Sequence, residues 1–191
     1  AAVNAKVETV LDSSHISEQQ ARDVLESVKR QNFRLAELVQ DLLLLSRLEQ
    51  KTLRTQKQTC CLNTLIEDLI EEFSALANAS SLQLTSSISF HQPLYVIGDE
   101  DQLLRLFSNL IANAIQYTPA GGSINLVLEK NNGDVVIEVI DTGIGISPQE
   151  QQVIFDRFYR VHESRSRRSG GSGLGLAIAQ VIAQAHGGKI R

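Results

Sequence analysis

The sequence predicts a chain in two parts, an α-helical hairpin over residues 1–50 and an α+β sandwich over residues 60–191. Two observations lead to this division. Over the first 50 residues, apolar side chains recur at alternating spacings of three and four, which is the period of bundled helices. From residue 60 onward, helical patterns and short strand-like stretches follow one another, and the helices are expected to segregate from antiparallel strands. Residues 51–59 are polar, lack a strong period and are expected to form a linker.

Composition and charge argue against several classes of protein. The 191 residues carry a formal net charge of -4, which gives no reason to expect nucleic acid as a partner. The longest apolar run, DLLLLS, is far shorter than the roughly 20 residues that a membrane span requires. Because Cys60 and Cys61 are adjacent, we expect two reduced thiols rather than a disulfide or a zinc site.

The long helix of the hairpin has a clear start and a wide apolar stripe. Ser17 followed by Gln20 is a capping-box pattern, which predicts a first turn near Glu18 and leaves residues 12–17 as the hairpin turn. The stripe consists of Leu25, Val28, Gln31, Leu35, Leu38, Val39, Leu42, Leu43 and Leu45. Dimerisation into a four-helix bundle would cover this stripe, and so would packing of the hairpin on the rest of the same chain.

The second part is expected to contain three helices and four strands. Asn63 and Asp99 are the expected caps of the first two helices, and Asn132-Gly133 is a strong signal for a tight hairpin turn. In order, we expect a helix at 63–79, a strand at 82–90, a strand at 93–98, a helix at 99–118, two strands within 123–141 and a glycine-closed helix at 174–188. The expected core of the second helix is Leu103, Leu106, Phe107, Leu110 and Ala114.

A polar stripe on that second helix contains Asn109 and Asn113, which lie four residues apart and therefore on one helical face. Gln102, Arg105 and Gln116 share the stripe. A polar stripe is usually a solvated face. An amide oxygen is nevertheless a suitable ligand for Mg²⁺, which takes few protein ligands together with waters and phosphates.

Two glycine clusters precede the last helix, and the second leads directly into it. In IDTGIGI, Asp141 ends a strand and can accept a hydrogen bond from an exocyclic amine, while the glycines let the backbone approach a flat ring. An ordinary turn is the alternative, and a dinucleotide fingerprint fits less well because its third glycine is missing. In SGGSGLGLAI, backbone N–H groups at a helix start suit a phosphate, although such clusters are also common in flexible linkers.

Between the glycine clusters lies a long segment that contains FDRFYRVHESRSRR. Phe155 and Phe158 are apolar anchors in it. Segments of this length with little helical signal are usually functional lids or disordered. The basic residues Arg165, Arg167 and Arg168 can either meet phosphate or be solvated.

Four motifs occur in a fixed order along the chain: NLIANAIQYTPAGG, DTGIGI, FDRFYR and GGSGLGLAI. This order resembles the N, G1, F and G2 boxes of bacterial two-component sensor histidine kinases. The helical part, which ends in LAELVQDLLLLSRLE, resembles their dimerisation and histidine-phosphotransfer domain. The resemblance covers nearly the whole chain. It implies a dimeric four-helix bundle followed by an α/β sandwich of the gyrase, Hsp90, histidine kinase and MutL superfamily that binds ATP and Mg²⁺.

The resemblance also implies roles for individual residues. Asn113 would bind Mg²⁺, Asn109 would support the phosphate end, Tyr117 would pack beside the adenine and Asp141 would bind its amino group. Gly143 and Gly145 would shape the adenine pocket. The implied ATP-binding set is Asn109, Asn113, Gln116, Tyr117, Asp141, Gly143, Gly145, Ile146, Arg160, Gly171, Ser172, Gly173, Leu174, Gly175 and Leu176.

Three departures bear on the implied chemistry. Related ATPases carry a glutamate where this chain has Asn109, and an amide cannot act as a general base. Transfer of the phosphoryl group to a protein side chain is therefore favoured over hydrolysis. Gln116 replaces a basic residue that many relatives have near the γ-phosphate, and His162 replaces a frequent acidic residue.

None of the four histidines fits the family's phosphoacceptor box, which reads His-Glu-x-x-Thr-Pro-Leu. AAVNAKVETVL resembles the stretch of the family's first helix directly after that box, so the acceptor is expected before Ala1. His15, His91, His162 and His186 are expected to have ordinary structural roles.

The resemblance further implies the partners of the chain. These are a second copy in a homodimer and the receiver domain of a response regulator, to whose aspartate the phosphate would pass. The chain would act in the cytoplasm, with any membrane anchor outside the chain. The alternative is a non-catalytic, ATP-binding dimeric scaffold that recruits a response regulator.

Overall fold

The structure is a computed structural model that describes residues 2–12, 16–49, 57–88, 92–160 and 172–191. The chain divides into two compact units, Ala1–Leu43 and Leu44–Arg191. The helices of the first unit and the mixed helix and sheet of the second confirm the predicted fold class. No described helix has the length and hydropathy needed to cross a membrane.

The first unit is formed by helix α1 (Ala2–Leu11) and most of helix α2 (Glu18–Glu49), which confirms the predicted helical hairpin. The predicted capping box is present. The Ser17 N–H donates to Gln20 Oε1 at 3.1 Å, and the Gln20 N–H donates to Ser17 Oγ at 3.2 Å. Two N–H groups that the first turn cannot pair internally are thereby satisfied, and α2 begins at Glu18 as predicted.

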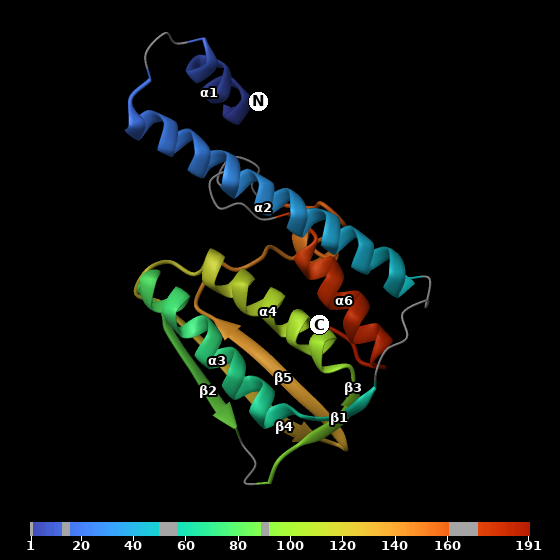
Figure 1. Cartoon of the computed structure of the whole chain (residues 1–191). Helices are drawn as coiled ribbons and strands as arrows, with labels where there is room; N and C mark the ends of the chain where they lie inside the picture. Colours follow the sequence, from blue (N-terminus) through green and yellow to red (C-terminus); the bar gives the residue numbers. More distant parts are fainter. Residues whose placement is uncertain (1, 13–15, 50–56, 89–91, 161–171) are drawn as a thin grey trace. The chain divides into compact units, whose positions relative to one another are not determined.

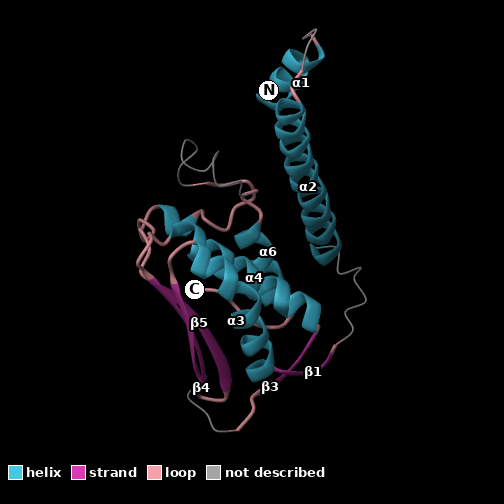
Figure 2. Ribbon diagram, turned by 60° about the vertical axis from the view of Figure 1, so that its left-hand side comes forward, coloured by secondary structure: helices cyan, strands magenta, loops and turns pink. Residues whose placement is uncertain are grey.

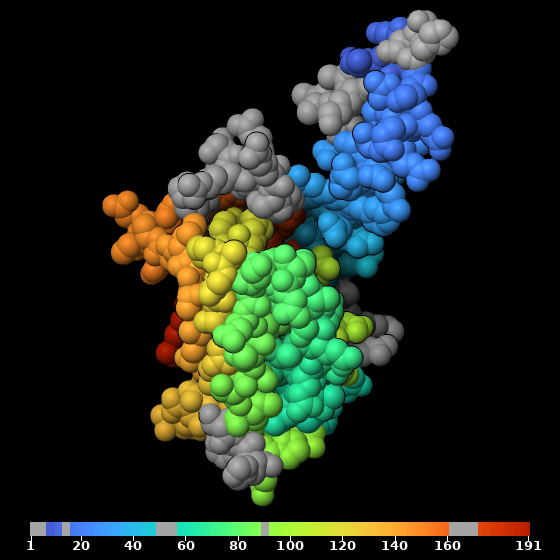
Figure 3. All heavy atoms as spheres, turned by 90° about the vertical axis from the view of Figure 1, so that its left-hand side faces the viewer, coloured from blue at the N-terminus to red at the C-terminus, as the bar shows by residue number. Residues whose placement is uncertain are grey.

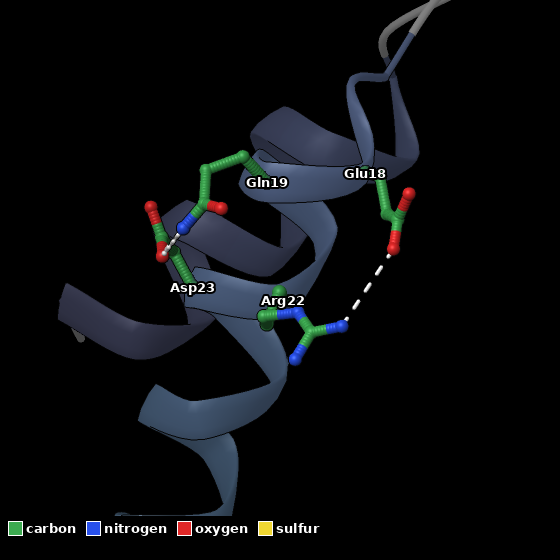
Figure 4. A network of polar contacts seen from close by, with 4 residues as sticks. All are labelled: Glu18, Gln19, Arg22 and Asp23. Atoms are coloured by element: carbon green, nitrogen blue, oxygen red, sulfur yellow. Dashed lines mark hydrogen bonds and ion pairs between the residues drawn. The ribbon is translucent and has the colours of Figure 1, made fainter.

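Helix α2 has one polar and one apolar side. On its first turns, Arg22 forms an ion pair with Glu18 at 3.6 Å, and Gln19 Nε2 donates to Asp23 Oδ1 at 2.9 Å (Figure 4). These exposed contacts between neighbouring turns stabilise the helix only slightly. A row of large apolar side chains along α2 is also exposed, comprising Leu25, Val28, Leu35, Val39, Leu42 and Leu43.

In its described residues, the second unit contains two sheets and three complete α-helices, besides the end of α2. A three-stranded sheet has the order β2 (Gln83–Ile88), β4 (Ser123–Asn131), β5 (Asp134–Asp141), and a two-stranded sheet pairs β1 (Gln58–Cys61) with β3 (Tyr95–Gly98). The helices α3 (Leu62–Ala79), α4 (Glu100–Tyr117) and α6 (Gly175–Ala185) lie on one side of the larger sheet (Figures 1 and 2). The residues of α3 and β2, teal to green, face the viewer in Figure 3.

The core of this unit lies between the helices and the larger sheet. Alternate residues of β4 face the helices and are fully buried, whereas the residues between them are half-buried or exposed. The largest buried side chains are Leu65, Ile66, Leu69, Ile111, Ile124, Leu126, Leu128, Leu174, Ile178 and Ile182. Of the core residues predicted for α4, Leu103, Leu106, Phe107 and Ala114 are buried, and Leu110 is only half-buried.

The larger sheet is mixed, which corrects the expectation of antiparallel strands. Strand β5 pairs with β4 in antiparallel fashion, but β2 pairs with β4 in parallel. A parallel pair requires a long crossover, and α4 lies in the segment that connects β2 to β4. The turn between β4 and β5 is formed by Asn132 and Gly133, both with positive φ, as predicted from the sequence.

Two local predictions differ from the structure. Asn63 is not the cap of α3; the cap position is Cys61, and Asn63 Oδ1 accepts a hydrogen bond from the Leu94 N–H at 2.8 Å. Its side chain therefore joins α3 to the residue before β3. Strand β1 begins at Gln58, within the segment expected to be a linker. The sequence did not predict this strand, because it is short and mostly exposed and therefore shows no apolar alternation.

Both cysteines are free thiols, in different surroundings. Cys60 is 2% exposed, and burial together with the nearby Glu100 carboxylate raises the pKa of its thiol. Cys61 is half-buried at the start of α3. The nearby N–H and hydroxyl of Thr64 favour the thiolate and lower the pKa of this thiol.

Candidate functional site

The polar stripe of α4 is positioned by a capped helix start. Asp99 Oδ1 accepts a hydrogen bond from the Gln102 N–H at 3.2 Å, and Asp99 Oδ2 accepts one from Gln102 Nε2 at 3.1 Å. Asp99 is thus the cap that the sequence predicted. Asn109 and Asn113 follow on one face of the helix and are both half-buried.

The amide of Asn109 has an unmet hydrogen-bonding capacity. Its Nδ2 atom is buried and, within the described residues, has no hydrogen-bond partner. A buried amide nitrogen without an acceptor costs free energy, so such a group suggests that an acceptor is supplied from outside the chain. A phosphate oxygen would be a suitable acceptor.

The turn after β5 lies against the C-terminal end of α4. Asp141 Oδ1 accepts a hydrogen bond from the Gly143 N–H at 2.8 Å, and the Ile144 N–H donates to the Tyr117 carbonyl at 3.2 Å. A Cβ at Gly143 would lie 2.8 Å from the Tyr117 carbonyl oxygen, so only glycine permits this approach. The structure therefore brings Tyr117, Asp141 and Gly143 together, with the Asp141 carboxylate exposed.

Four residues to which sequence reasoning gave no role support this turn, namely Thr118, Gly122, Ser123 and Thr142. Thr142 Oγ1 accepts a hydrogen bond from the Ser123 N–H at 2.9 Å. A Cβ at Gly122 would lie 2.4 Å from Thr118 Cγ2 and 2.7 Å from Thr142 Oγ1. Because Gly122 has no side chain, the loop after α4 can pack closely against Thr142, in the turn that follows β5. The only signal in the sequence was the Gly121-Gly122 pair.

The glycine cluster before α6 has a defined backbone where it is described. The Phe158 N–H donates to the Gly173 carbonyl at 2.9 Å, and a Cβ at Gly173 would lie 2.9 Å from the Phe158 backbone. Gly173 has φ +73° and Phe158 has φ 63°. Ser172 Oγ accepts a hydrogen bond from the Leu174 N–H at 3.2 Å. The hydrogen bond between their backbones places Phe158 of the F motif, FDRFYR, next to Gly173 of the G2 motif, GGSGLGLAI.

The start of α6 meets the polar stripe of α4. A Cβ at Gly175 would lie 3.3 Å from Asn109 Oδ1 and 3.5 Å from Asn109 Cγ. The first residue of α6 is therefore in close contact with the Asn109 amide. The N–H groups at the start of α6 lie in the first turn of a helix, where they have no partner within the helix.

The remaining predicted residues have varied surroundings. Gly145 has φ +70° and Ile146 is 42% exposed, whereas Leu174 is fully buried, so its side chain packs in the core. Gln116, Arg160, Ser172 and Leu176 are half-buried. Gly171 lies outside the described residues, as do His15, His91, His162, Arg165, Arg167 and Arg168.

The donor set limits the kind of metal that this site can hold. Within the described residues, no three His, Cys, Asp or Glu side chains are placed to bind a metal ion. A metal near Asn113 would therefore have few protein ligands, which suits Mg²⁺ coordinated by one amide oxygen, phosphate oxygens and water. The orphaned amide of Asn109 one helical turn away fits the same phosphate-bearing ligand.

Comparison with known proteins gives the family of the chain. Residues 98–191 match the family described as histidine kinase-, DNA gyrase B-, and HSP90-like ATPase. The sensor histidine kinase RppB of Synechocystis sp. is 53% identical over 192 residues, which cover 100% of this chain and 42% of RppB. The chain thus spans less than half the length of this relative.

Two solved structures share the fold. The full-length histidine kinase ShkA in complex with AMPPNP has a TM-score of 0.76 at 25% identity, covering 95% of this chain and 37% of ShkA. The histidine kinase ThkA in complex with the response regulator TrrA has a TM-score of 0.76 at 20% identity, covering 98% of this chain and 51% of ThkA. The chain therefore belongs to the sensor histidine kinases, with the ATPase domain of that family over residues 98–191.

Proposed function

We propose that this chain binds Mg-ATP and transfers the γ-phosphate to a histidine, from which it passes to an aspartate of a response regulator. The observation that carries the proposal is the contact of Asn109 with Gly175 at the start of α6. It brings Asn109, whose buried Nδ2 has no hydrogen-bond partner among the described residues, next to the N–H groups at the start of α6, and both groups favour phosphate.

The adenine end of the nucleotide is assigned to the turn after β5. Asp141 would accept a hydrogen bond from the adenine amino group, and its exposed carboxylate is available at the end of the strand. Tyr117, whose carbonyl is already bonded to this turn, would pack beside the base. Gly143 keeps both close together.

The phosphate end is assigned to the α4 stripe and the glycine cluster. Asn113 would hold Mg²⁺, which neutralises charge on the phosphates when it is bound. Asn109 Nδ2 would donate to a phosphate oxygen, and the residues 171–176 would surround the phosphates together with Gln116 and Arg160. Phosphoryl transfer depends mainly on positioning and charge neutralisation, so no general base is needed in the place of Asn109.

The partners follow from the same function. A receiver domain of a response regulator would take the phosphate, which is supported by the complex of ThkA, a protein of the same fold, with TrrA. A homodimer is supported by the exposed apolar row on α2. Because the reaction uses cellular ATP, we place the chain in the cytoplasm, with any membrane anchor outside the chain.

The proposal can be tested in two steps. Calorimetry should detect Mg-ATP binding by the 191-residue chain. In the full-length kinase, Asn113→Ala should abolish autophosphorylation while the fold, followed by circular dichroism, is unchanged. An Asn113→Ala kinase with normal autophosphorylation would contradict the metal assignment. ATP binding by a full-length protein that never transfers phosphate would favour a scaffold that recruits a response regulator.

A further inference from the structure

The imidazole of His186 connects the end of α6 to the start of α4. The Asp99 N–H donates a hydrogen bond to His186 Nε2 at 3.0 Å, and His186 Nδ1 lies 2.8 Å from the Ile182 carbonyl oxygen. Asp99 is the cap residue of α4, and His186 directly follows the last residue of α6. The bond therefore joins two helix ends that are 87 residues apart in the sequence.

Both contacts of the ring define one protonation state. Because a carbonyl only accepts, Nδ1 must carry the proton, and because a backbone N–H only donates, Nε2 must offer its lone pair. The neutral imidazole with the proton on Nδ1 is the one form that satisfies both. His186 thus acts as a specific acceptor for the cap of α4, and not as a general space-filling group.

The backbone around the ring is shaped to admit it. A Cβ at Gly98, the residue before the cap, would lie 2.9 Å from His186 Cδ2 and 3.0 Å from Leu103 Cδ1. A side chain at position 98 would therefore displace the imidazole or the first turn of α4. The absence of a side chain lets the ring approach the Asp99 N–H.

The contact of His186 lies at one end of the packing of α4 on α6. At the other end of α6, Gly175 meets Asn109. The two helices run in opposite directions, so His186 faces the start of α4 while Gly175 faces its middle. At 1.5 Å per residue, the 10 residues from Asp99 to Asn109 span about 15 Å, and the 11 residues from Gly175 to His186 span about 16.5 Å.

These matching lengths mean that the two contacts belong to one register between the helices, whose core residues also pack together. We propose that His186 is a positioning residue for the nucleotide site. It acts through the Asp99 N–H to hold α4 in the register that places Asn109, and with it Asn113, opposite the start of α6. This inference rests on the proposed function, in which these asparagines serve the Mg-phosphate end of ATP.

The two amide side chains that resemble histidine allow a sharp test. In His186→Gln the side-chain amide reaches the position of Nε2 and can accept from the Asp99 N–H. In His186→Asn the amide reaches only the position of Nδ1, so it can bond the Ile182 carbonyl but not the cap. Gln184→Asn is the control, because Gln184 is exposed near the same end of α6.

The measurement compares the affinities of the 191-residue chain for Mg-ATP and for adenosine. His186→Asn should weaken Mg-ATP binding by about two- to tenfold, the equivalent of one hydrogen bond. It should leave adenosine binding unchanged, because adenosine contacts the turn after β5. His186→Gln and Gln184→Asn should stay within about twofold of the wild type for both ligands.

A scalar coupling between the Asp99 amide nitrogen and His186 Nε2, measured by nuclear magnetic resonance in the ligand-free chain, tests the bond itself. Absence of this coupling would overturn the inference, and so would equal loss of Mg-ATP and adenosine binding in His186→Asn, which indicates a merely structural role. Unchanged Mg-ATP binding in that variant would also overturn it. A wild-type chain that shows the coupling but binds neither ligand would instead refute the proposed function on which the inference rests.

Discussion

At the scale of single residues, Asp141 is the most specific contact that we propose for the nucleotide. Its Oδ1 atom orders the turn by accepting from the Gly143 N–H. Asp141→Asn removes the charge that would bind the adenine amino group, and should weaken ATP binding by about 1.5–3 kcal/mol, the range for a charge-assisted hydrogen bond. Calorimetry with ATP and with GTP checks this. The preference for ATP should fall in the variant, and an unchanged ATP affinity would mean that the adenine binds elsewhere.

The two cysteines should differ in reactivity. Thr64 lowers the pKa of the Cys61 thiol, whereas burial raises the pKa of the Cys60 thiol. A lowered pKa increases the fraction of reactive thiolate at neutral pH, so iodoacetamide should alkylate Cys61 first. Peptide mass spectrometry over time measures both rates in one sample.

Thr64→Val tests the cause of that difference. The variant removes the hydroxyl donor, so Cys61 should react more slowly while Cys60 is unaffected. Equal alkylation rates of the two thiols in the wild type would contradict the assignment.

Local sequence rules predicted the residues whose partners are near in sequence. The cap at Asp99 bonds Gln102 three residues later, and the capping box joins Ser17 to Gln20. The same rules failed for Asn63, whose partner is Leu94, and gave no role to His186, whose partner is Asp99. A polar side chain near a helix end has several possible partners, and only the tertiary fold selects among them.

At the scale of elements, the turn between β4 and β5 offers a clear test of backbone conformation. Gly133 has φ +96° and open space around its Cα, so a Cβ there would be strained without any clash. Gly133→Ala should lower the free energy of unfolding by about 1 kcal/mol or more. Urea unfolding measures the change.

The control for this turn is Gly188→Ala. A Cβ at Gly188 would meet the Ala183 carbonyl oxygen at 3.4 Å, an ordinary contact, and its φ is not positive. It should therefore destabilise the chain less than Gly133→Ala. The reverse order would show that the positive φ at Gly133 is not the source of the cost.

Element types were more predictable than element pairing. The periods of the apolar residues and the Asn132-Gly133 turn predicted the helices and the β4–β5 hairpin. The parallel pairing of β2 with β4 could not be foreseen, because it depends on contacts between strands separated by α4. Likewise the Asn109–Asn113 spacing indicated a site, but the contact of Asn109 with Gly175 required the packing of α4 on α6.

At the scale of the whole molecule, we expect no phosphohistidine on this chain. His186 uses both ring nitrogens in contacts with Ile182 and Asp99, so phosphorylation would break one of them. No histidine lies in a sequence that resembles the acceptor box of the family. Incubation of the 191-residue chain with Mg-ATP should leave it free of acid-labile phosphate, as measured by mass spectrometry at neutral pH. Phosphate on His15 would show that the assignment of the acceptor is wrong.

We predict that the chain is a dimer. The first unit exposes a row of apolar side chains on α2, and their contact with water is unfavourable. Leu25 is 68% exposed, Leu35 60% and Leu43 51%, and all three lie along one side of α2. A second copy of the chain would cover this row by forming a four-helix bundle, so light scattering should give twice the chain mass of 21.0 kDa.

Leu35→Glu distinguishes this dimer from other associations. Leu35 is exposed in the single chain, so a carboxylate there costs little in a monomer, but it would be buried at the centre of the bundle. The variant should therefore be monomeric and remain folded. Gln40→Glu adds the same charge at an exposed position about 140° around α2 from Leu35 and should remain dimeric. If the wild-type chain is monomeric, or if both variants dissociate alike, the apolar row of α2 does not form the dimer interface.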